Sequence, residues 1–208
     1  MTTPAAVVHV VDDDEAVRDS LRFLLDAAGF AVRTHASAEA LLSAGPPLPG
    51  CVLTDVRMPG MDGLELLRRL RAAAITVPVV VITGHADVPM AVRALKAGAL
   101  DFLEKPFSDD TLVAAVRAAL DESRRTAEAR AQRETASTRI AELTPREREV
   151  FDLVVEGLPT KVIAKALGAS PRTIEVHRAR VMEKLGARSL PELVRLALTM
   201  QVEPRLGE

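Results

Sequence analysis

Residues 6–18 read AVVHVVDDDEAVR, an apolar run that ends in four consecutive carboxylates. A run of this kind is typical of a strand buried on both faces of a parallel sheet. Like charges packed this closely raise the pKa of some carboxyl groups unless a cation lies nearby. Asp14 and Glu15 fit a helix cap as well as a charged site. Asp12 and Asp13 therefore predict a charged site at the end of this strand, with a cation close to it.

The first 120 residues alternate short β-branched runs with helical patterns. The expected strands are residues 6–11, 31–34, 51–54, 79–83 and 100–104. The expected helices are residues 15–28, 37–43, 64–73, 88–97 and a segment from 110. Strict alternation favours a parallel sheet with helices on both faces. We predict an α/β domain with a five-stranded, doubly wound, flavodoxin-like sheet.

Polar residues stand at the carboxyl ends of these strands, where such sheets bind their ligands. Asp12 and Asp13 follow the first strand, Asp55 follows the third, Thr83 closes the fourth and Lys105 follows the fifth. Carboxylates suit Mg²⁺, and the lysine is the expected cation. This set favours phosphoryl transfer onto an aspartate, with metal and ammonium neutralising the transferred group.

Composition separates two halves of the chain. Residues 1–122 hold 11 Lys and Arg against 17 Asp and Glu, whereas residues 160–188 hold 7 against 2. This asymmetry indicates two domains with different partners. The single cysteine, Cys51, excludes an internal disulfide framework. No basic leader and no apolar segment of about 18 residues is present, so we expect a cytoplasmic protein without a membrane segment.

From Leu143 onward the pattern is all-helical, with expected helices near 145–156, 161–167, 171–185 and 190–200. Only three residues separate the second helix from the third, which is typical of a helix-turn-helix. Residues 123–138 contain neither Gly nor Pro and favour a helical linker over a coil. We therefore divide the chain into an α/β domain (1–122), a linker (123–138) and an all-α four-helix domain (139–208).

The third of these helices has one apolar face, formed by Ile174, Val181 and Leu185, and an opposite face able to enter a major groove. A solvated helix face would look similar, so the prediction also depends on the short turn and the caps. The predicted phosphate contacts are Lys161, Arg172, Arg180 and Lys184, and the predicted base contacts are Thr173, Glu175 and Val176.

The segments VDDDE, LTDVRMPGMDG, VVVITGHADV and GALDFLEKPF resemble the receiver domain of two-component response regulators, in its FixJ-like branch, over residues 5–120. The resemblance implies that Asp55 accepts a phosphoryl group from a sensor histidine kinase. It also implies Mg²⁺ or Mn²⁺ held by Asp13, Asp55 and the backbone carbonyl of Arg57, with Asp12 acting through a water.

The same resemblance assigns roles on the fourth and fifth strands. Thr83 would hydrogen-bond the phosphoryl group, Lys105 would pair with it, and Phe102 would turn inward as a switch. A cis peptide before Pro106 is expected as well. Phosphorylated receivers would then form a homodimer through the face of the fourth helix and fifth strand, using Val88, Val92 and Leu95.

Residues 143–198 resemble the LuxR-type DNA-binding domain, which implies a transcription regulator that binds double-stranded DNA and works with RNA polymerase. Pro159-Thr160 replaces the small polar pair of many relatives, and Glu175 stands where other branches have Lys, so the base preference does not transfer. The last helix, with Leu193, Leu196 and Ala197, is the expected contact between two DNA-binding domains.

Two functions of other classes fit parts of the pattern. A haloacid-dehalogenase-like, Mg²⁺-dependent phosphatase would use a nucleophile after the first strand, and Asp12-x-Asp14 matches its D-x-D pattern. Two features argue against this enzyme. Asp55 forms a second polar site away from the first strand, and the chain lacks the cap insertion that would enclose a small substrate. A phosphorylated module whose helices bind RNA or protein is the other alternative.

Overall fold

The computed structural model describes residues 6–46, 48–84 and 88–201. The chain forms two compact units, Met1–Ala127 and Glu128–Glu208. In the described part, no helix is long and apolar enough to cross a membrane.

A five-stranded sheet in the order β2-β1-β3-β4-β5 forms the centre of the first unit, and all neighbouring strands are parallel. Its strands are β1 (Val7–Val11), β2 (Ala31–His35), β3 (Gly50–Asp55), β4 (Val79–Thr83) and β5 (Asp101–Glu104). Every residue of β4 is buried, which explains why it reads VVVIT without alternation. These observations confirm the predicted fold class.

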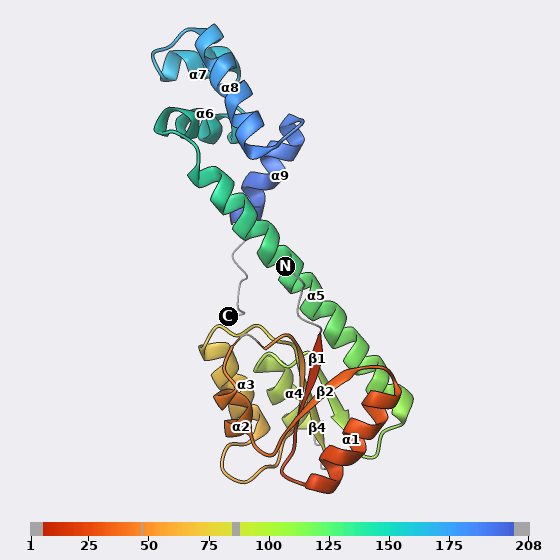
Figure 1. Ribbon diagram of the computed structural model, residues 1–208. Helices are drawn as coiled ribbons and strands as arrows, with labels where there is room; N and C mark the ends of the chain where they lie inside the picture. Colours follow the sequence, from red (N-terminus) through yellow and green to blue (C-terminus); the bar gives the residue numbers. More distant parts are fainter. Residues whose placement is uncertain (1–5, 47, 85–87, 202–208) are drawn as a thin grey trace. The chain divides into compact units, whose positions relative to one another are not determined.

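Helices cover both faces of this sheet (Figure 1). On one face, α1 (Glu15–Ala27) and the first half of α5 (Asp109–Ala141) bury residues such as Leu25 and Leu112. On the other face lie α2 (Ala38–Ser43), α3 (Gly63–Ala72) and α4 (Val88–Lys96). The predicted strand and helix positions in this unit agree with the structure to within one or two residues.

Asp14 is an N-cap, because its Oδ1 accepts a hydrogen bond from Ala16 N at 2.8 Å. Asp62 caps α3 in the same way, accepting from Glu65 N at 2.6 Å. Two acidic residues of the sequence motifs therefore serve helix starts. The carboxylates of Asp12 and Asp55 have other partners.

The second unit contains α6 (Pro145–Val155), α7 (Thr160–Ala166), α8 (Pro171–Leu185) and α9 (Leu190–Gln201). Thr144 and Glu147 form a reciprocal capping box at the start of α6. The core of this unit includes Ile163, Ile174, Val181 and Leu185 of α7 and α8. Ala136 and Ile140, in the last turns of α5, are 4% and 6% exposed; Ile140 belongs to that core. The end of α5 is therefore part of this unit, and α5 as a whole covers residues 123–138.

Candidate functional site

An aspartate from each of two neighbouring strands meets one lysine at the carboxyl edge of the sheet. Lys105 Nζ lies 3.0 Å from Asp55 Oδ1 and 3.4 Å from Asp12 Oδ2. The register brings them together, because Val11 pairs with Thr54 and the next residue on each strand is an aspartate. Lys105 N donates to Thr83 O at 2.8 Å, which carries the lysine to the same edge. The cation that the opening stretch required is therefore Lys105.

The Asp55 carboxylate and backbone are held by their own loop. Arg57 N donates to Asp55 Oδ2 at 2.6 Å, so both carboxylate oxygens have a donor. The buried Thr54 hydroxyl donates to Asp55 O at 3.0 Å. A Cβ at Gly63 would lie 2.2 Å from Asp55 O, so only glycine allows α3 to start this close to the strand. Thr54 and Gly63 were not predicted as site residues. Gly63 is the second glycine of the GMDG motif, and a glycine at this position is a sequence signal for a close approach of the backbone.

Arg18 reaches back from α1 to the loop that carries the first two aspartates. Its Nη1 donates to Asp12 O at 2.8 Å and to Asp13 O at 2.9 Å. Asp12 Oδ1 also accepts from Asp14 N at 3.0 Å, and Asp12 is almost fully buried. Asp13 follows with an exposed side chain. Arg18 is thus a further supporting residue, which the pattern of α1 alone did not single out.

Burial raises the pKa of the Asp12 carboxyl above its usual range, opposed by the Asp14 amide and by the charge of Lys105. Burial lowers the pKa of Lys105, but the hydrogen bond and charge of Asp55, with the charge of Asp12, more than offset it and raise the pKa. Lys105 is therefore held as an ammonium. Lys105 pairs with the carboxylates of both Asp12 and Asp55, whereas the Arg18 guanidinium bonds the backbone carbonyls of Asp12 and Asp13.

The donor set at this edge suits a hard divalent cation. Asp12 and Asp55 present carboxylate oxygens, and Asp13 follows Asp12 directly. Among the described residues, no three His, Cys, Asp or Glu side chains form a metal-binding group. A metal ion here would therefore depend on backbone carbonyl and water oxygens as well, which is how Mg²⁺ is usually held.

Thr83 and Phe102 lie on the two strands beside the aspartates. Thr83 is buried at the last position of β4, paired with Glu104 of β5. Phe102 is partly buried and packs against the core between the sheet and α2–α4. The Lys105–Pro106 peptide is cis, as predicted. The hydroxyl and the ring thus lie on adjacent strands, as a coupled movement would require.

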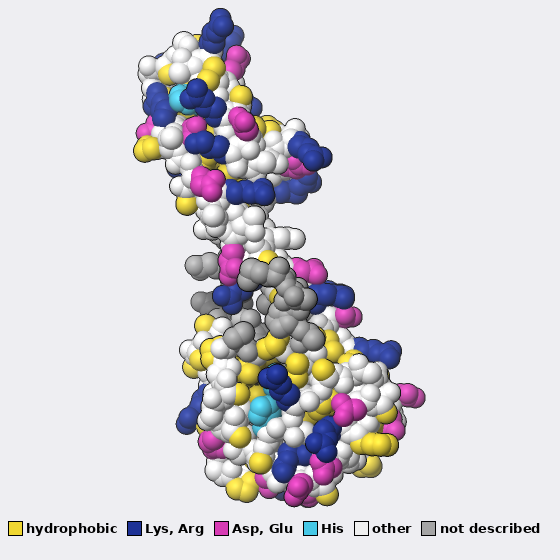
Figure 2. Space-filling model, in the orientation of Figure 1, with side chains coloured by type: hydrophobic (Ala, Val, Ile, Leu, Met, Phe, Trp, Pro, Cys, Tyr) yellow, Lys and Arg dark blue, Asp and Glu magenta, His cyan; other side chains and the backbone are white. Residues whose placement is uncertain are grey.

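In the second unit, α8 presents its polar face outward. Ile174, Val181 and Leu185 are buried, whereas the opposite face is exposed and Val176 is 47% exposed. Figure 2 shows Lys and Arg side chains gathered over this unit on the face turned to the viewer. The exposed predicted contacts are Lys161, Arg172, Thr173, Glu175, Val176 and Arg180. None of the four basic or acidic side chains among them has a recorded ion pair in the described part of the chain.

Lys184 differs from the other predicted phosphate contacts. Its Nζ lies 2.7 Å from Glu147 Oε2 and donates to Glu142 O at 3.2 Å. The Glu147 side chain is 4% exposed and the Lys184 side chain is 35% exposed, so the ion pair joins a buried carboxylate to an ammonium at the surface of the unit. Lys184 therefore has an ion-pair partner within its own unit, and its role as a phosphate contact stays a prediction.

The residues expected to form dimer contacts differ in their exposure to solvent. Val92 and Leu95 of α4 are 42% and 51% exposed, and the side chain of Val88 lies outside the described part. In α9, Leu193 and Ala197 are 1% and 5% exposed and belong to the core. The prediction that these two residues contact a second DNA-binding domain is wrong, because α9 buries them against its own unit; Leu196, the third expected contact, is partly buried against the same core.

Comparison with protein families gives two matches. Residues 8–117 match the response regulator receiver domain, and residues 141–197 match the luxR family of bacterial regulatory proteins. The transcriptional regulatory protein FixJ of Azorhizobium caulinodans is 56% identical, over 95% of this chain and 94% of the relative. The FixJ protein of Rhizobium meliloti is 53% identical, over 92% and 94% of the two chains.

Solved structures agree with these matches. The response regulator StyR superposes with a TM-score of 0.81 at 42% identity, covering 93% of this chain and 98% of the other. Full-length FixJ from B. japonicum gives a TM-score of 0.58 at 50% identity, covering 96% and 98%.

Proposed function

The chain belongs to the two-component response regulators that join a receiver domain to a LuxR-type DNA-binding domain, and we propose that phosphoryl transfer to Asp55 controls its binding to DNA. It is a transcription regulator. The observation that carries the proposal is the convergence of Asp12, Asp55 and Lys105, with Lys105 Nζ 3.0 Å from Asp55 Oδ1.

The reaction is displacement at phosphorus. A carboxylate oxygen of Asp55 attacks the phosphoryl group of a phosphohistidine on the sensor kinase. The new P–O bond forms as the P–N bond breaks, and the imidazole nitrogen leaves with the electron pair. The Lys105 ammonium, already bound to Asp55 Oδ1, then pairs with a phosphoryl oxygen, and the Thr83 hydroxyl is placed to hydrogen-bond another.

Asp13, Asp55 and the Arg57 carbonyl would hold Mg²⁺ or Mn²⁺ directly, with Asp12 acting through a water. When bound, the metal neutralises charge on the phosphoryl oxygens. The sharing of one ammonium between two carboxylates supports this assignment. Arg18 keeps the loop of Asp12 and Asp13 in place through their backbone carbonyls.

Phosphorylation adds charge at one point of a tightly packed sheet edge. Movement of Thr83 toward the phosphoryl group would leave space for Phe102 to turn inward, which changes the face of α4 and β5. Val92, Leu95 and Leu100, all at least 40% exposed, provide an apolar surface there for a homodimer. Two linked DNA-binding units then occupy adjacent half-sites at raised effective concentration. RNA polymerase is a further partner of the regulator. The protein acts in the cytoplasm, where it binds the DNA.

The phosphatase alternative is not supported, because both family matches and the FixJ relatives are those of response regulators. The arrangement of the site also favours Asp55 over the first strand as the point of attack. The Asp55 side chain is 12% exposed and lies 3.0 Å from the Lys105 ammonium, whereas the Asp12 side chain is 6% exposed and lies 3.4 Å from it.

Incubation with a small acyl phosphate and Mg²⁺, followed by intact mass measurement, tests the proposal. One added phosphoryl group per chain is expected, absent in Asp55→Asn and retained in Asp62→Asn, which removes one carboxylate from the same loop but keeps an N-cap oxygen for α3. Steady release of phosphate from phosphomonoesters would instead favour an enzyme. An unmodified chain under these conditions would contradict the proposal.

A further inference from the structure

The end of α5 and the end of α8 are joined by two hydrogen bonds that run in opposite directions. Arg139 Nη1, on α5, donates to Leu185 O at the end of α8, at 3.0 Å. Lys184 Nζ, on α8, donates to Glu142 O just after the end of α5, at 3.2 Å. Each helix therefore supplies a cation to the carbonyls at the other helix's C-terminus.

Helix C-termini leave carbonyls without intrahelical partners and carry partial negative charge. A cation at a helix C-terminus donates hydrogen bonds to these carbonyls and offsets their partial negative charge. Because each cation comes from the other helix, neither helix can rotate about its axis or slide without breaking its own cap and its neighbour's. The pair therefore constrains the direction of α8 as well as its stability.

Gly186, the residue that ends α8, leaves room for the Arg139 side chain in this contact. It ends α8 with φ 66°, the left-handed conformation that favours glycine. A Cβ there would lie 3.0 Å from Arg139 Nη1. The guanidinium thus occupies the space that a side chain at position 186 would need.

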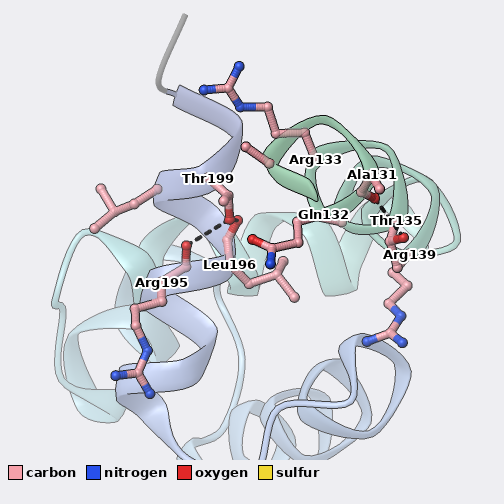
Figure 3. A pocket seen from close by; sticks show the side chains of 11 residues that line it. Ala131, Gln132, Arg133, Thr135, Arg139, Arg195, Leu196 and Thr199 are labelled. Carbon is pink, nitrogen blue, oxygen red and sulfur yellow. Dashed lines mark hydrogen bonds between the residues drawn. The ribbon is translucent and has the colours of Figure 1, made fainter. Parts of the chain in front are cut away.

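The Arg139 side chain lines a groove beside α9, but its hydrogen bond is made to α8. A groove of about 770 Å³ lies between the end of α5 and α9, lined by residues including Gln132, Leu196 and Thr199. In Figure 3, Arg139 leaves α5 on the side away from Leu196 and Thr199. In the second unit, the Arg139 side chain therefore links α5 to α8 by a hydrogen bond.

We propose that Arg139 is a positioning residue for DNA recognition: its bond to Leu185 O, with the reciprocal Lys184–Glu142 bond, holds α8 at the angle at which its exposed face reads base edges. This rests on the proposed DNA binding by α8. Phosphate contacts carry no sequence information, whereas hydrogen bonds to base edges read the sequence and depend on how the recognition helix is held in the groove. Loss of the bond should therefore reduce sequence selectivity more than overall affinity.

The test compares Arg139→Met, which keeps the apolar stem and removes the donors, with Arg139→Lys, which keeps a donor. Arg133→Met is the matched control, since Arg133 lies on the same helix and has no recorded ion pair in the described part of the chain. The full chain, treated with acyl phosphate and Mg²⁺, selects a duplex from random DNA. Circular dichroism identifies a temperature at which every variant is fully folded. The affinities for that duplex and for a scrambled duplex are then measured at this temperature.

Arg139→Met should lower the ratio of the two affinities about tenfold, the size of one lost base contact, with the scrambled duplex bound as before. Arg139→Lys should restore most of the ratio, and Arg133→Met should leave it unchanged. An unchanged ratio in Arg139→Met, or an equal loss in Arg133→Met, would overturn the inference. Failure of the unmodified chain to select any duplex would instead contradict the proposed function.

Discussion

Lys105 Nζ lies 3.0 Å from Asp55 Oδ1, although 50 positions separate the two residues along the chain. The contact exists because β3 and β5 both end at the carboxyl edge of one sheet, on either side of β4. It is also the one recorded ion pair of Asp55 in the described part of the chain.

Lys105→Ala should slow phosphorylation of Asp55 by acyl phosphate on the order of 10²-fold, because one charge-stabilising donor of the transition state is lost. The initial rate of phosphoryl incorporation with Mg²⁺ present measures this. Lys96→Ala removes the same charge from the exposed end of α4 and should react like the unmodified chain. Equal rates for the two variants would contradict the role given to Lys105.

Gly63→Ala should destabilise the first unit by about 1–3 kcal/mol, because the new Cβ would lie 2.2 Å from the carbonyl oxygen of Asp55. Thermal unfolding of that unit, followed by NMR signals of the sheet, is the measurement. Gly84→Ala serves as the control, since a Cβ there meets nothing within 4 Å. Unchanged stability in Gly63→Ala would mean that α3 can shift away from the strand.

Leu95→Asp should abolish dimer formation after phosphorylation, because a charge is placed in the apolar α4 surface, and should leave phosphorylation intact, because Leu95 is an exposed residue outside the set of site residues. Sedimentation velocity with and without acyl phosphate gives the oligomeric state. Phe23→Asp places the same charge on α1, where Phe23 is 79% exposed, and should still dimerise. Dimerisation of Leu95→Asp would require another interface.

Arg180→Ala should weaken DNA binding and reduce the slope of log K against log[salt] by about 1, as expected for one lost phosphate contact. Titrations of a fluorescent duplex at several salt concentrations provide the slope. Arg195→Ala changes the same charge on α9, where no DNA contact is proposed, and should leave the slope nearly unchanged. A wild-type slope in Arg180→Ala would remove this residue from the interface.

Acid should loosen the second unit through Glu147. The hydrogen bond from Lys184, then those from Thr144, lower the pKa of Glu147 to about 2, against burial, which raises it. A folded-state pKa below the unfolded value of 4.5 stabilises the fold above pH 4.5, and this stability is lost as the pH falls from 4.5 toward 2.

Urea unfolding of the second unit, followed by NMR signals of α6 at pH 5 and pH 3, measures this loss. In Glu147→Gln the difference between the two pH values should shrink, because the ionisable group is gone. Glu149→Gln, an exposed neighbour on the same helix, should keep the full difference. A pH dependence that survives in Glu147→Gln would have to come from other carboxyl groups.

The positions of the strands and helices, the helix-turn-helix and the set of polar residues at the sheet edge could be predicted from the sequence. Burial patterns and caps such as Thr144 with Glu147 depend on residues only a few positions apart, so they can be read along the chain. The common edge of these polar residues followed from the alternation of elements, since parallel strands place all their carboxyl ends at one edge.

Contacts between distant segments were decided only by the tertiary structure. A lysine on the polar side of α8 has the same local pattern whether it meets a phosphate or a carboxylate, and the position of α6 directs Lys184 to Glu147. Likewise, the pattern of α9 identifies an apolar face but not its partner, and the structure buries Leu193 within its own unit. Local sequence sets which face is apolar or charged, whereas the packing of distant helices determines what each face contacts.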